Sequence, residues 1–170
     1  MIKLVKPSIK YKDSFIESVN EFHNEGKYND YYNLEIICND FNKFLSSYDD
    51  EEKGINLAEG YVPATNLWLV DDNKFLGRVS IRHKLTKKLL NEGGHIGYGV
   101  RPSERKKGYG NKILELSLPI ARKIGIDKAL LICDDDNIGS YKIIEKNGGI
   151  LENKVKAGNR LMRRYWINLD

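Results

Sequence analysis

The chain has 170 residues, of which 41% are hydrophobic and 31% charged, a composition typical of a soluble globular protein with one core. Its formal net charge of +4 is too small to indicate nucleic-acid binding unless the basic residues gather on one face. The only cysteines, Cys38 and Cys133, belong to no Cys or His cluster, so we expect no disulfide framework, no metal site and a cytoplasmic location. No export signal or long apolar segment is visible, and one domain over residues 1–170 with no membrane partner is predicted.

The first third of the chain is predicted to be mostly helical. A short strand is expected at residues 2–5, and Phe15, Val19 and Phe22 then recur at helical spacing. A second helix is expected around residues 41–45.

The middle of the chain changes to the periodicity of strands. Residues 66–71 and 75–81 flank a polar turn and predict a β-hairpin. A third strand is expected at 95–100, where two glycines indicate a bulge or a close approach by another backbone.

The last part of the chain alternates helices and strands. Apolar positions predict a long helix over 108–125, a buried strand at 129–133, a short helix at about 138–147 and a last strand at 164–169. The order strand, helix, strand across residues 95–133 predicts a parallel βαβ unit with a right-handed crossover. The predicted fold class is therefore mixed α/β.

A basic loop lies between the third strand and the long helix. Gly108 and Gly110 would let backbone N–H groups approach an anion, and the following helix adds the positive end of its dipole. Arg105, Lys106 and Lys107 add full charges, so the loop predicts a pyrophosphate site. A solvated basic loop is the alternative, and the spacing matches neither a Walker A loop nor a dinucleotide fingerprint.

Two motifs are similar to those of one known superfamily. Residues 105–110 resemble the R/Q-x-x-G-x-G/A acyl-CoA loop of the Gcn5-related N-acetyltransferases (GNAT), and residues 136–149 resemble the N-x-x-A/S segment of the same superfamily. Residues 93–98, 147–149 and 164–167 are also similar to a bacterial subgroup of uncharacterised acetyltransferases within it.

The resemblance implies a fold and a cosubstrate. The fold would be a central, mostly antiparallel sheet flanked by helices, with a parallel βαβ unit whose middle strands splay apart to admit acetyl-CoA, without a metal. A strand N–H would polarise the thioester carbonyl and stabilise the oxyanion. Asn137 could equally serve only as a helix N-cap. The residues expected to bind acetyl-CoA are Tyr98, Gly99, Val100, Arg105, Lys106, Lys107, Gly108, Tyr109, Gly110, Asn137 and Ser140.

Acetyl transfer to an amine needs a base and an acid. His95 is the expected base because an imidazole titrates near neutral pH, and a hydrogen-bonded structural role is its alternative. Where many members carry a catalytic tyrosine this chain has Ile144, so that role does not carry over. Tyr141 is the remaining candidate acid, or packs as an ordinary aromatic residue.

The implied function is that of an acetyl-CoA-dependent N-acetyltransferase that transfers directly to a primary amine of a small molecule or peptide. The missing tyrosine keeps an alternative open, a GNAT-like module that senses acyl-CoA without turnover. Nucleic-acid binding is not expected, because no aromatic residues interleave with the basic ones, and exposed strand edges allow a homodimer. In this family the N-terminal helical region covers the acceptor, so its aromatic residues could shape that site, although packing is the expected role for most of them: Phe22, His23, Tyr28, Tyr31 and Tyr32.

Overall fold

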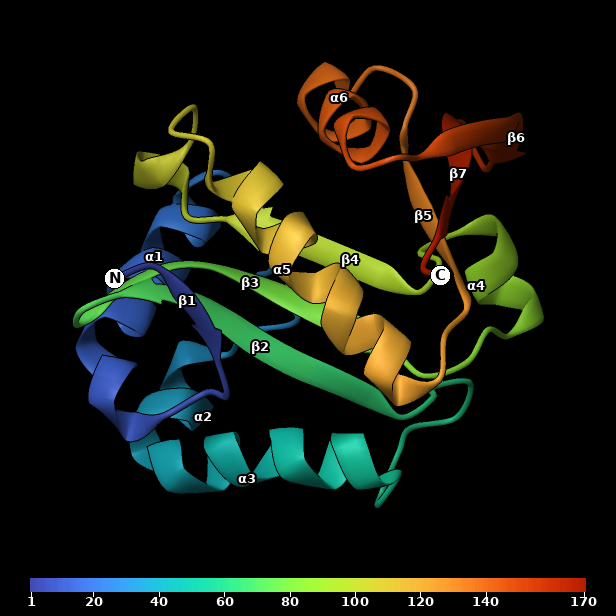
Figure 1. Cartoon of the computed structure of the whole chain (residues 1–170). Helices are drawn as coiled ribbons and strands as arrows, with labels where there is room; N and C mark the ends of the chain where they lie inside the picture. Colours follow the sequence, from blue (N-terminus) through green and yellow to red (C-terminus); the bar gives the residue numbers. More distant parts are fainter.

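The computed structural model describes all 170 residues and shows a mixed α/β fold with two antiparallel sheets (Figure 1). The first sheet has the order β1 (Lys3–Val5), β2 (Ala64–Asp71), β3 (Lys74–Arg82), β4 (Ile96–Val100). The second has the order β5 (Lys128–Asp134), β7 (Arg160–Asn168), β6 (Ile150–Ala157). The predicted fold class is confirmed.

Helices cover both faces of the first sheet (Figure 1). The helices on one face are α1 (Lys12–Asn24), α2 (Leu34–Asn39) and α3 (Phe41–Lys53), and the helix on the other face is α5 (Tyr109–Ile124). The two remaining helices are α4 (Lys87–Asn91), which follows β3, and α6 (Ile138–Lys146), which follows β5. None of the helices has both the length and the apolar character needed to cross a membrane.

Aromatic side chains pack α1 against strands β2 and β3 of the first sheet. Phe15 stacks on Trp68 with ring centroids 4.4 Å apart and meets Phe75 edge-on at 5.3 Å. Burial of rings of this size is a major source of folding free energy. Phe15 also meets Tyr32 at 5.4 Å and Phe22 meets Tyr28 at 4.9 Å, so aromatic contacts hold the segment after α1 as well.

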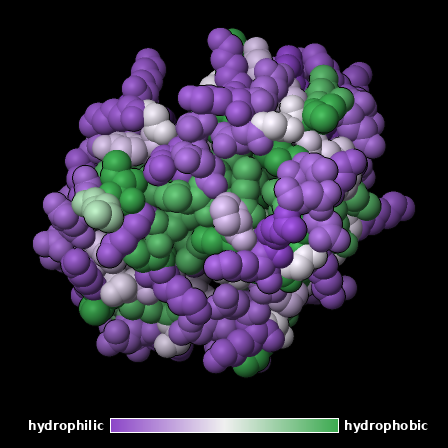
Figure 2. Space-filling model, viewed as in Figure 1, coloured by the Kyte–Doolittle hydropathy of each residue, from purple (hydrophilic) through white to green (hydrophobic).

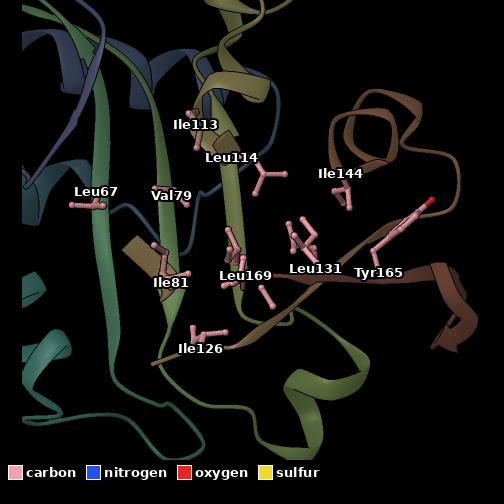
Figure 3. Close-up of a cluster of buried hydrophobic side chains, with 14 of the residues drawn as sticks. Leu67, Val79, Ile81, Ile113, Leu114, Ile126, Leu131, Ile144, Tyr165 and Leu169 are labelled. Atoms are coloured by element: carbon pink, nitrogen blue, oxygen red, sulfur yellow. The ribbon is translucent and has the colours of Figure 1, made fainter. Parts of the chain in front are cut away.

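A second core joins the two sheets through α5. Figure 3 shows side chains of the first sheet, of α5 and of the second sheet converging on one another. The labelled members include Leu67, Val79, Ile81, Ile113, Leu114, Leu131 and Tyr165. Figure 2 shows the molecule from the side on which α5 lies, and hydrophobic side chains reach the surface across the middle of that side, surrounded by hydrophilic ones.

The strands β4 and β5 diverge instead of pairing. They are not hydrogen-bonded neighbours in either sheet, and an isolated bridge links Gly94 to Leu131. The two strands of the predicted βαβ unit thus belong to different sheets, which agrees with the splay implied by the resemblance. Gly94 makes the single bridge possible, because a Cβ at its φ of +64° would overlap the carbonyl oxygen of Leu130.

The glycines of β4 have a different role from the predicted bulge. The register between β3 and β4 runs without a shift, so no bulge is present. A Cβ on Gly97 would lie 3.5 Å from Nη2 of Arg82, and one on Gly99 would lie 3.0 Å from the hydroxyl oxygen of Tyr28. The predicted close approach is thus made by side chains rather than by a backbone.

Replacement of Gly94 by alanine should destabilise the fold. We expect Gly94→Ala to lower the free energy of unfolding by about 2 kcal/mol or more, from backbone strain and overlap with Leu130 together. Gly158→Ala is the matched control, since Gly158 has a φ of +61° and a methyl group added there would meet nothing within 4 Å. Urea unfolding compares the two variants, and an equal loss in both would contradict the tight contact at Gly94.

Candidate functional site

A cleft of about 800 Å³ opens beside β4, where β5 has turned away. The structure brings together at this cleft ten of the residues predicted to bind acetyl-CoA, which are Tyr98, Gly99, Val100, Arg105, Lys106, Gly108, Tyr109, Gly110, Asn137 and Ser140. Lys107 is the predicted residue that does not line it. Phe22 and Tyr28, which the sequence named only as residues that could shape the acceptor site, also line this cleft, together with Lys27, which the sequence did not indicate.

One wall of the cleft is a strand edge with free backbone groups. The N–H of Arg101 donates to the carbonyl oxygen of Leu76 in β3 at 2.8 Å. Arg101 and every second residue before it in β4 therefore direct their backbone groups toward β3. Because antiparallel bonding alternates along a strand, the N–H and C=O groups of Tyr98 and Val100 point away from β3, toward the cleft. Such an edge can hydrogen-bond an extended ligand that carries amide groups.

The turn before α5 presents an anion-binding surface. Lys106 and Gly108 have φ values of +62° and +85°, and Gly108 precedes α5 without any side-chain cap. The first N–H groups of the helix are therefore free for a ligand. At Gly110 a Cβ would lie 2.8 Å from Cδ1 of Ile143, so a larger residue there would require the Ile143 side chain to shift where α5 and α6 meet.

The basic side chains of the loop divide between two sides. Arg105 forms a bidentate pair with Glu25 at 2.8 and 2.9 Å, at the rim of the cleft. The Lys107 ammonium pairs with the buried Glu104 at 2.9 Å and lines a separate depression. A buried carboxylate therefore holds the Lys107 side chain on the opposite side of the loop from the cleft. Lys106 lines the cleft and has no ion-pair partner.

The start of α6 forms the far side of the cleft. Oδ1 of Asn137 accepts a hydrogen bond from the N–H of Ser140 at 3.1 Å, so Asn137 caps the helix and lines the cleft at once. The Tyr98 hydroxyl lies 3.3 Å from Oγ of Ser140. Burial raises the pKa of Tyr98 to about 12, so its hydroxyl stays protonated near neutral pH.

His95 connects the diverging strands. Its backbone N–H donates to the Leu130 oxygen at 2.7 Å, and its ring Nδ1 accepts from the Leu130 N–H at 2.9 Å. In a neutral ring that accepts at Nδ1, the proton is on Nε2. Burial, and then the charge of Arg82, lower the pKa of His95. The ring does not line the cleft, and its role as the base stays a prediction.

Neither of the two α6 residues considered as the acid, Tyr141 and Ile144, lines the cleft. The Tyr141 ring packs against Arg163, whose guanidinium carbon lies 3.9 Å from the ring centroid, and it does not line the cleft. Ile144 is buried in the second core near Leu131 (Figure 3). A role for Tyr141 in proton transfer also stays a prediction.

A second cleft, of about 400 Å³, adjoins the first on the face of β3 that α1, α2 and α3 cover. Tyr28 lines both clefts. The second cleft also contains Tyr31, which the sequence named as a residue that could shape the acceptor site, and three charged residues that the sequence did not indicate, Arg78, Arg82 and Glu51. The available signal was the pair of arginines four residues apart in one strand, because that spacing places both side chains on the same face.

Glu51 is the half-buried carboxylate of this second cleft. Its Oε2 accepts a hydrogen bond from Nδ2 of Asn66 at 2.8 Å. Burial raises the pKa of Glu51, although the hydrogen bond from Asn66 opposes that shift. The group can therefore take up a proton at a higher pH than an exposed glutamate.

Comparisons with known proteins agree with this architecture. A family model described as an acetyltransferase (GNAT) domain matches residues 15–150. No curated protein matches the sequence.

Solved structures share the fold at low sequence identity. The acetyltransferase of Salmonella typhimurium that modifies the N-terminal serine of ribosomal protein L7/L12 is 15% identical, with a TM-score of 0.68 over 99% of this chain and 95% of that one. The microcin C7 self-immunity acetyltransferase MccE, solved with acetyl-CoA and AMP, is 20% identical, with a TM-score of 0.65 over 98% and 92%. The PaiA N-acetyltransferase of Thermoplasma acidophilum, solved with coenzyme A, is 18% identical, with a TM-score of 0.59 over 96% and 98%.

Proposed function

The chain belongs to the GNAT acetyltransferase family, and we propose that it transfers the acetyl group of acetyl-CoA directly to a primary amine. The observation that supports this most is the free edge of β4, which leads from the gap between the sheets to the uncapped start of α5. Acetyl-CoA supplies the activated acyl group as a thioester.

The residues of the first cleft fit the chemistry of coenzyme A. The backbone groups of Tyr98 and Val100 would bond the amides of its pantetheine arm. The N–H groups at the start of α5 and the ammonium of Lys106 would hold its pyrophosphate. Asn137 and Ser140 would contact the arm from the opposite wall.

Direct transfer forms an amide C–N bond and breaks the thioester C–S bond. The amine loses a proton and the departing thiolate gains one, so the chain needs groups that accept and donate a proton. A covalent intermediate on cysteine is not part of the proposal. Cys38 and Cys133 line neither large cleft, and burial raises the pKa of Cys133.

We assign the proton-accepting role to Glu51, with His95 as the alternative. Glu51 lines the second cleft, which adjoins the cofactor cleft at Tyr28. His95 lines neither, and its Nδ1 lone pair accepts from Leu130. For the acid we retain Tyr141, and an unchanged kcat in Tyr141→Phe would remove it from the mechanism.

The acceptor is proposed to be a small molecule or a peptide, in the cytoplasm. The alternative of an acyl-CoA sensor differs from the enzyme in one measurable property, turnover.

A homodimer stays a prediction, and the largely exposed edge strand β6 is the surface available for it.

Amine-dependent release of the CoA thiol tests the proposed function. We expect the purified protein to bind acetyl-CoA saturably in calorimetry and to release thiol only when an accepted amine is present. Binding without release across a broad panel of amines would support the sensor instead. Absence of acetyl-CoA binding would contradict both.

The division of the basic loop gives a matched pair of charge reversals. Lys106→Glu should weaken CoA binding about tenfold or more, because a carboxylate would replace the free ammonium at the cleft. Lys107→Glu should bind CoA nearly as the wild type does, because Lys107 points to Glu104. Calorimetric titration with CoA measures both, and a stronger effect at Lys107 would contradict this assignment.

The pH dependence of transfer distinguishes the two candidate bases. Glu51 accepts a proton only when ionised, so activity should fall as the pH falls through its raised pKa. Glu51→Gln should lower kcat about 100-fold and remove that acidic limb, with CoA affinity retained. His95→Gln should keep the limb. The opposite pattern would assign the role to His95, whose pKa is lowered from its ordinary value.

A further inference from the structure

Arg78 is the only arginine of the chain whose side chain forms no hydrogen bond or ion pair with another residue. It lies in the middle of β3, half-buried, and lines the second cleft. The buried Arg101 shows the usual arrangement, with Glu21 at 2.7 Å and Glu17 at 3.1 Å. A guanidinium removed from water normally has such a partner, because its charge is otherwise costly to bury.

Two tyrosine rings compensate the charge of Arg78 only in part. The guanidinium carbon lies 5.6 Å from the ring centroid of Tyr28 and 5.5 Å from that of Tyr31. Ring faces attract a cation, but they do not replace oxygen acceptors for the five N–H groups of an arginine. The cleft is therefore lined by a positioned cation with hydrogen-bond donors to spare.

The neighbouring cation Arg82 is already occupied. Its Nη1 donates to the carbonyl oxygens of Gly93 at 3.0 Å and Gly94 at 3.1 Å. Arg82 thus supports the bridge between the sheets, whereas the Arg78 side chain supports no other element through a polar contact. This contrast separates a structural arginine from one that is free for a ligand.

Arg78 also lies next to the cleft in which acetyl-CoA is proposed to bind. It is the direct cross-strand partner of Gly99, which belongs to the stretch of β4 that lines the cofactor cleft. Tyr28, which lies against Arg78, lines both clefts. A group bound to Arg78 is therefore near the reacting end of the acetyl donor.

From these contacts we propose that the acceptor is a small amine carrying a carboxylate or phosphate that binds Arg78, an inference that rests on the proposed acetyl transfer. The guanidinium fork matches either anion in a bidentate geometry. Because Arg78 and the reacting end are close, few bonds separate the amine from the anion. The volume of about 400 Å³ suits a ligand of amino-acid size.

The distribution of charge in the cleft agrees with such an acceptor. Glu51 lines the same cleft without forming an ion pair with Arg78, so it remains available to a cationic amine. A ligand with one anionic and one amine group would be matched at both positions. A simple diamine would place a positive charge against Arg78.

Matched amines test the proposal by thiol release. The pairs are phenylalanine and phenylalaninamide, β-alanine and β-alaninamide, and 2-aminoethyl phosphate and ethanolamine. We expect the wild type to prefer the anionic member of at least one pair about tenfold or more in kcat/KM. The two carboxylate pairs and the phosphate pair show which anion is selected. Equal or better turnover of the neutral members would overturn the proposal while leaving acetyl transfer intact.

Variants of Arg78 test the contact itself. Arg78→Met should remove the preference for the anion with CoA affinity unchanged, and Arg78→Lys should keep part of it. Lys lacks the fork but retains the charge, so it also serves if the methionine variant does not fold. Arg160→Met, at the exposed start of β7, is the control and should keep the preference. An equal loss with charged and neutral amines in both Arg78 variants would overturn the proposal.

A binding measurement keeps the inference separate from turnover. Calorimetry of the protein saturated with CoA should detect an anionic amine of the same panel, and Arg78→Met should abolish its binding. This result without any thiol release would support the anion site and contradict the proposed transfer. Failure of every anionic amine to bind the CoA complex, or binding that persists in Arg78→Met, would overturn the anion site.

Discussion

The divergence of β4 from β5 is the constraint on which the rest of the molecule depends. The strands meet at Gly94 and Leu131, and beyond this bridge each belongs to a different sheet. The separation leaves backbone groups of β4 without strand partners, which a folded protein avoids unless a ligand or water satisfies them. The shared core beneath α5 holds the sheets together despite the gap (Figure 3). The cleft is thus a consequence of topology, and side chains only refine it.

The N-terminal helix connects the two clefts. Arg101, just after β4, bonds Glu21 and Glu17 of α1, and Arg105 bonds Glu25 at the end of the same helix. These contacts tie the basic loop to α1, while the aromatic core ties α1 to β2 and β3. The segment after α1 is therefore held over Gly99, where Tyr28 lies between the cofactor cleft and the second cleft. Tertiary contacts, rather than local sequence, create this arrangement.

The sequence was informative where local pattern and chemistry coincide, as in the glycines and cations before α5. It could not predict the direction of a side chain or the contacts between elements far apart in the sequence. Lys106 and Lys107 are equivalent in a sequence motif, but the buried Glu104 separates them. Strand β6 was missed because its charged residues give an exposed edge no apolar alternation. Arg78 and Glu51 come from separate elements, so only the fold reveals that they share a cleft.

The fold alone would favour an apolar residue at the position of Arg78. The same face of the sheet buries Trp68, the direct cross-strand partner of Arg78, in an aromatic cluster. An apolar side chain there would extend that cluster and avoid the desolvation of a charge. Residues that oppose stability in this way are typical of binding sites, where the ligand supplies the missing interaction. The bare edge of β4 and the unpaired guanidinium are therefore the same kind of feature, polar groups that the folded chain leaves for two substrates to satisfy.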